Sequence, residues 1–155
     1  MNRPLRIFTS YNDADERTAL DLQRQLALAL QPAQVVFWDR KSIPVEDYRA
    51  GAAKFISTAD LFVAVLSMNY EDTGETRFEM AQAVEQQRQR PGLQIVTVAA
   101  RAAHIPAPLR PFLPALPAGE TVEDQHLSRD RQLSRAATSA VQTLHAAPKT
   151  NDIPI

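Results

Sequence analysis

Glu79 is the first candidate for chemistry in this sequence, because of the stretch that precedes it. Six consecutive apolar residues, 61–66, end at Ser67, and a polar loop then leads into a helical stretch that carries Glu79. Ligands of open parallel α/β sheets bind beyond the carboxyl ends of the strands, so this loop and Glu79 are expected at the functional edge. An ionised carboxylate there can stabilise a positive charge that develops during a reaction, and the first turns of a helix favour the ionised form. The alternative is a solvated glutamate without chemistry, one of 18 acidic residues.

A second group of polar residues, Tyr11, Asn12 and Asp13, follows the first short β-prone segment, residues 5–9. These side chains are expected to line the same crevice. Turn and capping chemistry is an equally suitable interpretation, because Asp13 with Glu16 three residues later resembles a capping box.

Trp38 ends another short apolar run, residues 34–38. Its ring can stack on a ligand, although an aromatic residue at the end of a buried strand more often belongs to the core. The next three residues are Asp39, Arg40 and Lys41. We expect them either to contact a phosphate or a neighbouring domain, or to form a solvated loop. Ser67 either lies beside a ligand or only completes the turn after its strand.

The elements that position these residues alternate along the chain. A strand with six consecutive apolar residues, 61–66, is predicted to be buried on both faces. Other strands are predicted at 5–9, 34–38 and 93–100, with a brief fifth strand at 121–123, and helices lie between them at 13–31, 45–57 and 75–89. A last helix begins after Ser128 as N-cap and runs to about residue 145, with a small-residue apolar face. Such alternation favours a parallel sheet built from right-handed βαβ units.

The overall composition limits the class of protein. A chain of 155 residues with 45% hydrophobic and 23% charged residues is typical of one soluble domain. A net charge of −1 gives no reason to expect nucleic acid or a membrane surface as partner. The chain has no cysteine, no apolar run of membrane length and no secretory signal, so a cytoplasmic location is expected.

Several common site motifs are missing from the sequence. Its four glycines are too far apart for a dinucleotide-binding or phosphate-binding glycine loop. The three histidines have no metal-ligand spacing and are interpreted as surface residues. No serine lies in a nucleophile elbow. A nucleotide-dependent dehydrogenase, a P-loop NTPase, a serine hydrolase and a metal site are therefore not expected.

Three short segments in a fixed order resemble one family. Residues 6–11 (RIFTSY) resemble the first box, (F/I)-x-S-Y, of Toll/interleukin-1 receptor (TIR) domains. Residues 38–44 (WDRKSIP) resemble the second box and its BB loop, and residues 66–79 (LSMNYEDTGETRFE) resemble the stretch L-S-x-N-(F/Y)-x-x-S-x-W-C-x-x-E. Together these segments identify the chain as similar to bacterial-type TIR domains.

The resemblance implies a fold and a function. The expected fold is a flavodoxin-like three-layer α/β sandwich, with a parallel five-stranded sheet in the order 2-1-3-4-5, spanning residues 1–146 and followed by a disordered tail at 147–155. The expected activity is NAD+ glycohydrolysis, with Glu79 as the catalytic carboxylate and with activation by self-association, in bacterial immune or effector signalling. NAD+ is then the substrate, no cofactor is expected, and other TIR domains are the partners.

The resemblance also assigns the remaining residues to two sets. The expected substrate-binding residues lie near the strand ends: Ser10, Tyr11, Asn12, Asp13, Trp38, Ser67 and Tyr70. The expected interaction loop is Asp39, Arg40, Lys41, Ser42, Ile43, Pro44, Val45 and Glu46.

Two alternatives remain open at this point. A non-catalytic scaffold that acts through TIR–TIR contacts is favoured by two departures from the family pattern. Val45 and Glu46 stand where the BB loop often carries glycine, and Glu75-Thr76 stands where Trp-Cys is common. A cyclase that forms cyclic ADP-ribose differs from a hydrolase only in the access of water to the same intermediate.

Overall fold

A parallel sheet forms the centre of the computed structural model, which describes residues 3–146. Within that range the sheet has four strands in the order β2-β1-β3-β4: β1 Leu5–Tyr11, β2 Val35–Trp38, β3 Leu61–Leu66 and β4 Gln94–Ala99. The predicted parallel α/β architecture is confirmed, but the sheet has four strands rather than five. The residues predicted as a disordered tail, 147–155, lie outside the described range.

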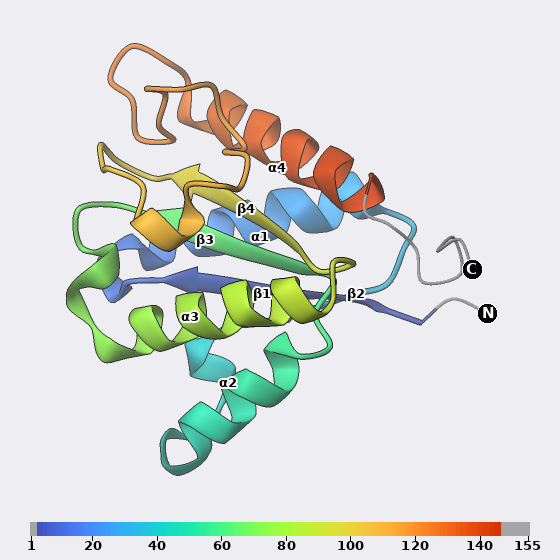
Figure 1. The fold of residues 1–155 in the computed structure, drawn as a ribbon. Coiled ribbons are helices and arrows are strands. Elements are labelled where there is room, and N and C mark those ends of the chain that lie inside the picture. The colour runs from blue at the N-terminus through green and yellow to red at the C-terminus, as the bar shows by residue number, and fades with distance from the viewer. Residues whose placement is uncertain (1–2, 147–155) are drawn as a thin grey trace.

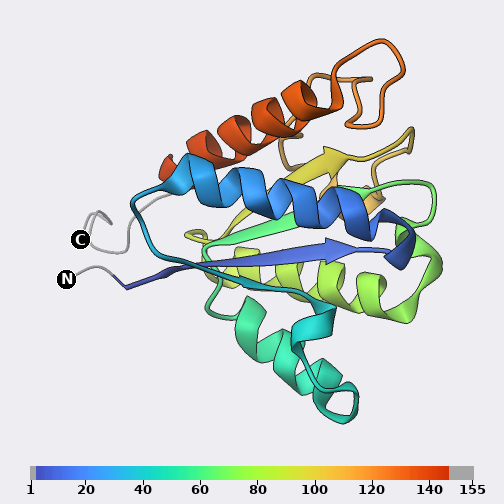
Figure 2. The same cartoon turned by 180° about the vertical axis from the view of Figure 1, so that it is seen from behind.

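Helices cover both faces of this sheet, so that three layers result (Figures 1 and 2). Helices α1 (Glu16–Leu30) and α4 (Arg129–His145) pack on one face, and α2 (Tyr48–Ile56) and α3 (Gly74–Gln89) pack on the other. Five short 3-10 helices lie in the connections of the described part: η1 Asp13–Asp15, η2 Arg40–Ser42, η3 Val45–Asp47, η4 Tyr70–Asp72 and η5 Ala107–Leu109. None of the helices in residues 3–146 is both long enough and apolar enough to span a membrane.

Strand β3 is the centre of the core, as its sequence predicts. All six of its residues are buried. Because side chains alternate across a strand, three of them join the core beneath α1 and α4, and the other three join the core beneath α2 and α3. The two sets are Leu61, Val63 and Val65, and Phe62, Ala64 and Leu66.

Helix α4 also agrees with its sequence pattern. The Ser128 hydroxyl accepts a hydrogen bond from the backbone N–H of Arg131 at 3.3 Å, as expected of an N-cap. The small side chains Ala136, Ala137 and Ala140 are buried against the core shared with α1.

The fifth strand predicted at 121–123 is not formed, and the sequence before it gives the reason. Ala115 N–H donates to the Thr97 carbonyl at 2.8 Å, and Val122 N–H donates to the Ala99 carbonyl at 2.9 Å. Between these two contacts the chain turns at Gly119, where φ is +83°. Pro114 and Pro117 have no N–H to donate to a ladder. The edge of β4 is therefore covered by isolated contacts, and the predicted order 2-1-3-4-5 becomes 2-1-3-4.

The prediction of a capping box at Asp13 and Glu16 is also wrong. Asn12 caps η1 instead, and its side-chain oxygen accepts from the Ala14 N–H at 2.9 Å. Asp13 pairs with Arg40 and Glu16 pairs with Lys41. These two acidic side chains therefore hold the 39–47 segment against the start of α1.

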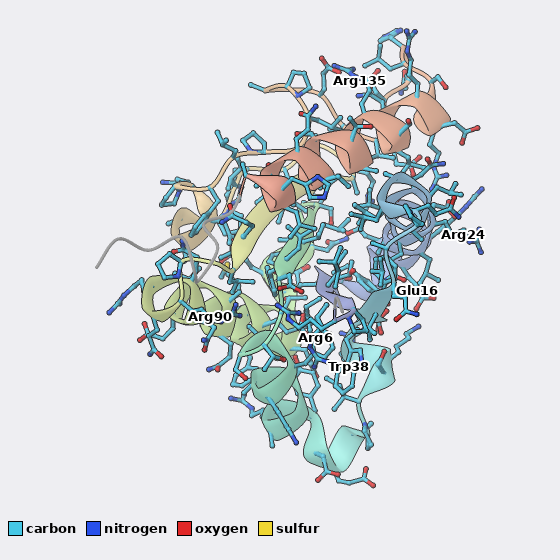
Figure 3. All side chains as sticks on the ribbon, turned by 90° about the vertical axis from the view of Figure 1, so that its right-hand side faces the viewer. Arg6, Glu16, Arg24, Trp38, Arg90 and Arg135 are labelled. Atoms are coloured by element: carbon cyan, nitrogen blue, oxygen red, sulfur yellow. The ribbon has the colours of Figure 1, made fainter. Side chains whose placement is uncertain are left out.

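Trp38 is partly buried and packs against the core beneath α2 and α3. Its ring stacks on Phe55 of α2, with centroids 4.4 Å apart, and the Arg6 guanidinium lies 4.4 Å from the centroid of the same Phe55 ring. Figure 3 shows Trp38 and Arg6 close together beside the sheet, near α2. The core interpretation of Trp38 fits this position.

Replacement of Phe62 by alanine tests the central role of β3. Phe62 is fully buried and stacks on Phe8 with centroids 5.7 Å apart, so Phe62→Ala is expected to lower the free energy of unfolding by about 3–5 kcal/mol. Leu28→Ala, at a side chain that is 60% exposed, is the control and is expected to change it by less than about 0.5 kcal/mol. Urea denaturation measures both, and equal losses would contradict the assignment of β3 as the core strand.

Candidate active site

The carboxyl ends of β1, β3 and β4 meet at one edge of the sheet, on the left of Figure 1. The candidate residues approach this edge from separate segments. Ser10 lies near the end of β1, Tyr70 begins η4 after β3, and Glu79 lies in the second turn of α3. The three side chains meet beneath α2 and α3.

Glu79 is held there by two hydroxyl groups. The Ser10 Oγ donates to Glu79 Oε1 at 2.6 Å, and the Tyr48 hydroxyl donates to Glu79 Oε2 at 2.5 Å. The Tyr70 hydroxyl lies 2.8 Å from Ser10 Oγ and extends the chain of hydrogen bonds by one step. Glu79 is only 1% exposed, so the carboxylate has exchanged water for these hydroxyls.

Burial raises the pKa of Glu79 to about 7, from an ordinary value of 4.5. The hydrogen bonds from Ser10 and Tyr48 and the charge of Arg40 act in the opposite direction, but they are smaller than the loss of hydration. The expectation that the helix start keeps Glu79 ionised is therefore corrected. With a pKa of about 7, both the protonated and the ionised form of Glu79 are populated near neutral pH.

A cleft of about 440 Å³ lies on the outer side of this group. Its walls come from Arg40, Ile43, residues 45–50 and Glu75. Tyr48 is the residue common to the cleft wall and to the hydrogen bonds of Glu79. The carboxylate therefore lies behind Tyr48 rather than on the surface of the cleft.

The residues expected beside Glu79 at the end of β1 make contacts within the protein. The Tyr11 hydroxyl donates to Asp39 Oδ2 at 3.0 Å, and burial with the nearby Asp39 charge raises the pKa of Tyr11 above its usual range. The Asn12 amide donates to the Asn69 carbonyl at 3.0 Å. These bonds join the β1 end to the 39–47 segment and to the loop after β3.

Ser67 takes part in a second buried group, which the sequence analysis missed. Its hydroxyl donates to Asp15 Oδ2, and Arg101 donates to Asp15 Oδ1 at 3.1 Å from Nη2. Asp15 is 3% exposed. This acid joins the loops that follow β1, β3 and β4, on the α1 side of the edge. An aspartate in the first βα turn and an arginine just after β4 are the only sequence signals for it.

The expected interaction loop has a buried and an exposed side. Ile43 is 7% exposed, and it lies so close to α2 that a Cβ on Gly51 would meet its Cγ2 at 2.6 Å. Asp39 caps η2 and is 8% exposed. Val45, in contrast, is 89% exposed. The segment is thus fixed on its inner side and presents an apolar side chain outward.

Tyr48 is the main residue of this site that sequence reasoning did not assign. It is 31 residues from Glu79, at the start of a different helix, and no periodic pattern relates the two. Tyr70 and Ser10 were expected at the site, and the structure places both within one or two hydrogen bonds of Glu79. Among residues 3–146, no group of three or more His, Asp or Glu side chains is arranged to hold a metal ion.

Glu79 is expected to make the stability of the protein depend on pH. Its pKa is higher in the folded state than in the unfolded state, so the folded form loses stability as pH rises from about 4.5 through about 7. The difference between these two pKa values corresponds to roughly 3 kcal/mol.

The variant Glu79→Gln isolates this contribution. Its amide keeps the neutral pattern of hydrogen bonds, so the advantage of the variant over the parent protein is expected to grow by roughly 3 kcal/mol between pH 4.5 and pH 8.5. Urea denaturation of both proteins across this range is the measurement. A constant difference between them would show that the folded protein does not raise the pKa of Glu79.

Comparison with known proteins agrees with this architecture. A family model described as TIR domain matches residues 7–136. Among solved structures, a chain from the crystal structure of the RPS4 and RRS1 TIR domain heterodimer is similar in fold, with a TM-score of 0.62 and 14% sequence identity, over 92% of this chain and 99% of that chain. A search of curated proteins gave no match. Because the family model spans well over half of the sequence, the chain belongs to the TIR domain family.

Proposed function

We propose that this TIR domain cleaves NAD+ at the bond between nicotinamide and ribose, with Glu79 as the catalytic carboxylate. The observation that carries the proposal is the burial of one carboxylate at the carboxyl edge of the sheet, clamped by two hydroxyls and adjacent to a cleft. An acidic side chain with a perturbed pKa beside a cleft is typical of a functional site. The family resemblance drawn from the sequence points to the same reaction.

The chemistry requires only one carboxylate. As the bond from ribose C1′ to the ring nitrogen breaks, its electron pair leaves with nicotinamide, and positive charge develops on C1′ and the ring oxygen. Ionised Glu79 stabilises that charge, and it does so strongly because little water surrounds it. Nicotinamide departs as a neutral base, so no general acid is needed. Water then adds to C1′ and releases a proton, which yields ADP-ribose, or a nitrogen of the adenine base adds instead and yields a cyclic product.

Access to Glu79 requires movement of the segment that covers it. Tyr48 separates the carboxylate from the cleft, and the preceding segment is held to β1, η1 and α1 by polar contacts of Asp39, Arg40 and Lys41. Two of these contacts are ion pairs between partly exposed side chains, and each such ion pair is weak. We therefore propose that self-association, or NAD+ itself, displaces residues 39–47 and opens a path past Tyr48 to Glu79.

A scaffold function is the second candidate, and a specific observation favours it. Glu79 is sealed in this structure, while Val45 projects from the 39–47 segment with acidic Glu46 and Asp47 beside it. A similar solved structure is a heterodimer of TIR domains. In the scaffold function, the protein acts by binding another TIR domain, and Glu79 has no chemical role.

Nicotinamide release from NAD+ separates the two functions. In the NADase, release is expected to rise faster than linearly with protein concentration, because association activates it. Glu79→Gln is expected to lower the rate at least about 100-fold, by analogy with loss of a single electrostatic group in other enzymes. Chromatography of the products measures nicotinamide and shows whether the ADP-ribose is linear or cyclic.

Glu85→Gln is the matched control, because Glu85 lies on the same helix with a half-exposed side chain that pairs with Arg88. Its rate is expected to equal that of the parent protein. Undiminished release by Glu79→Gln would remove the catalytic role of Glu79. No release by the parent protein at any concentration, with or without a crowding agent, would favour the scaffold.

A further inference from the structure

Tyr48 lies between the cleft and the buried carboxylate of Glu79. It is the first residue of α2, its ring packs on Phe78 with centroids 6.1 Å apart, and it lines the cleft. Its hydroxyl oxygen is 2.5 Å from Glu79 Oε2 and 3.1 Å from the carbonyl oxygen of Glu75. The hydroxyl therefore faces two acceptors but has a single hydrogen to give.

This arrangement satisfies both protonation states of Glu79 without movement of a side chain. When Glu79 is ionised, Tyr48 donates its hydrogen to Oε2. When Glu79 is protonated, Oε2–H donates to the Tyr48 oxygen, and the Tyr48 hydrogen turns to the carbonyl of Glu75. Ser10 donates to Oε1 in both states, and Tyr70 supplies a hydrogen to Ser10. Each hydrogen is used once in either pattern.

Tyr48 itself remains protonated while Glu79 titrates. Burial, together with the negative charge of Glu79, raises the pKa of the Tyr48 hydroxyl well above its usual value. Tyr48 thus acts as a donor to the carboxylate and does not act as a base. A donor to the charged form favours ionisation.

The surroundings of Glu79 contain few other charges that compete with this effect. Besides Tyr48 and Tyr70 themselves, the titratable or charged groups that interact with Glu79 or with the hydroxyls of these two tyrosines come from two regions. They are Tyr11, Asp39 and Arg40, from β1 and the 39–47 segment, and Glu71 and Glu75, from η4 and α3. Arg40 is the only cation in this set, and it is paired with Asp13. The direct hydrogen bonds of Glu79 come from Ser10 and Tyr48.

We propose that Tyr48 is a positioning residue for Glu79: its hydroxyl orients the carboxylate and favours the ionised form that the reaction uses. The catalytic part of this inference rests on the proposed NADase function. The hydrogen bond and its effect on ionisation do not, because they are properties of the folded chain.

Carbon-13 NMR of the glutamate side-chain carboxyl groups tests the inference without any assay of activity. The resonance of Glu79 is identified as the one missing from Glu79→Gln. In Tyr48→Phe, which keeps the ring on Phe78 and loses only the hydroxyl, the titration midpoint of Glu79 is expected to rise by roughly one pH unit, because a donor to the charged form is lost.

Tyr70→Phe is the matched control for the same chemical change one bond farther away. Ser10 still donates to Glu79 in this variant, so the midpoint of Glu79 is expected to move by less than half as much as in Tyr48→Phe. Tyr48→Leu provides a second variant that removes the hydroxyl, and it is expected to raise the midpoint in the same direction. Amide spectra of each variant establish that the fold is retained.

The pH profile of nicotinamide release supplies a second readout. If Tyr48 acts through Glu79, the rising limb of the rate moves to higher pH in Tyr48→Phe by the same amount as the NMR midpoint. A shifted midpoint in a protein that releases no nicotinamide would refute the proposed function but support the hydrogen-bond assignment. An unchanged midpoint in the folded Tyr48→Phe variant would overturn the role of Tyr48, whether or not the parent protein cleaves NAD+.

Discussion

Desolvation of one carboxyl group explains the polar chemistry beneath α2 and α3. Glu79 lies within a core of aromatic and aliphatic side chains, where an unpaired charge would be very unfavourable. Ser10 and Tyr48 offset part of that loss, and Tyr70, itself buried, finds in Ser10 the partner that a buried phenol requires. The same packing that stabilises the sheet therefore creates the unusual carboxyl group.

Asp15 and Glu79, two of the buried acids at this edge, have different partners, which suit them to different uses. Asp15 contacts the guanidinium of Arg101 and the hydroxyl of Ser67. The positive charge of Arg101 therefore balances the negative charge of Asp15, and these contacts join three loops. Glu79 contacts hydroxyls, and its nearest influence from a cation is the Coulomb effect of Arg40. A neutralised carboxylate is suited to structure, whereas a carboxylate held by neutral donors keeps its charge available to a substrate.

Local sequence patterns predicted the elements better than they predicted the site. The six apolar residues of β3 and the N-cap Ser128 are set by interactions within a few residues, and both were correctly predicted. Tyr48 was not, because its contact with Glu79 depends on how α2 packs against α3. The ionisation of Glu79 was predicted in the wrong direction for a similar reason: a helix position is visible in the sequence, but its burial is not.

The 39–47 segment links the two candidate functions physically. Its inner side holds Asp39 against Tyr11, it leads directly into Tyr48 on Glu79, and its outer side exposes Val45. Under the proposed function, a partner that docks on the outer side and shifts this segment also uncovers the carboxylate. Linkage is reciprocal, so a substrate that displaces this segment favours docking by the same free energy. Association and catalysis would then be two consequences of one equilibrium of this segment, rather than competing descriptions of the domain.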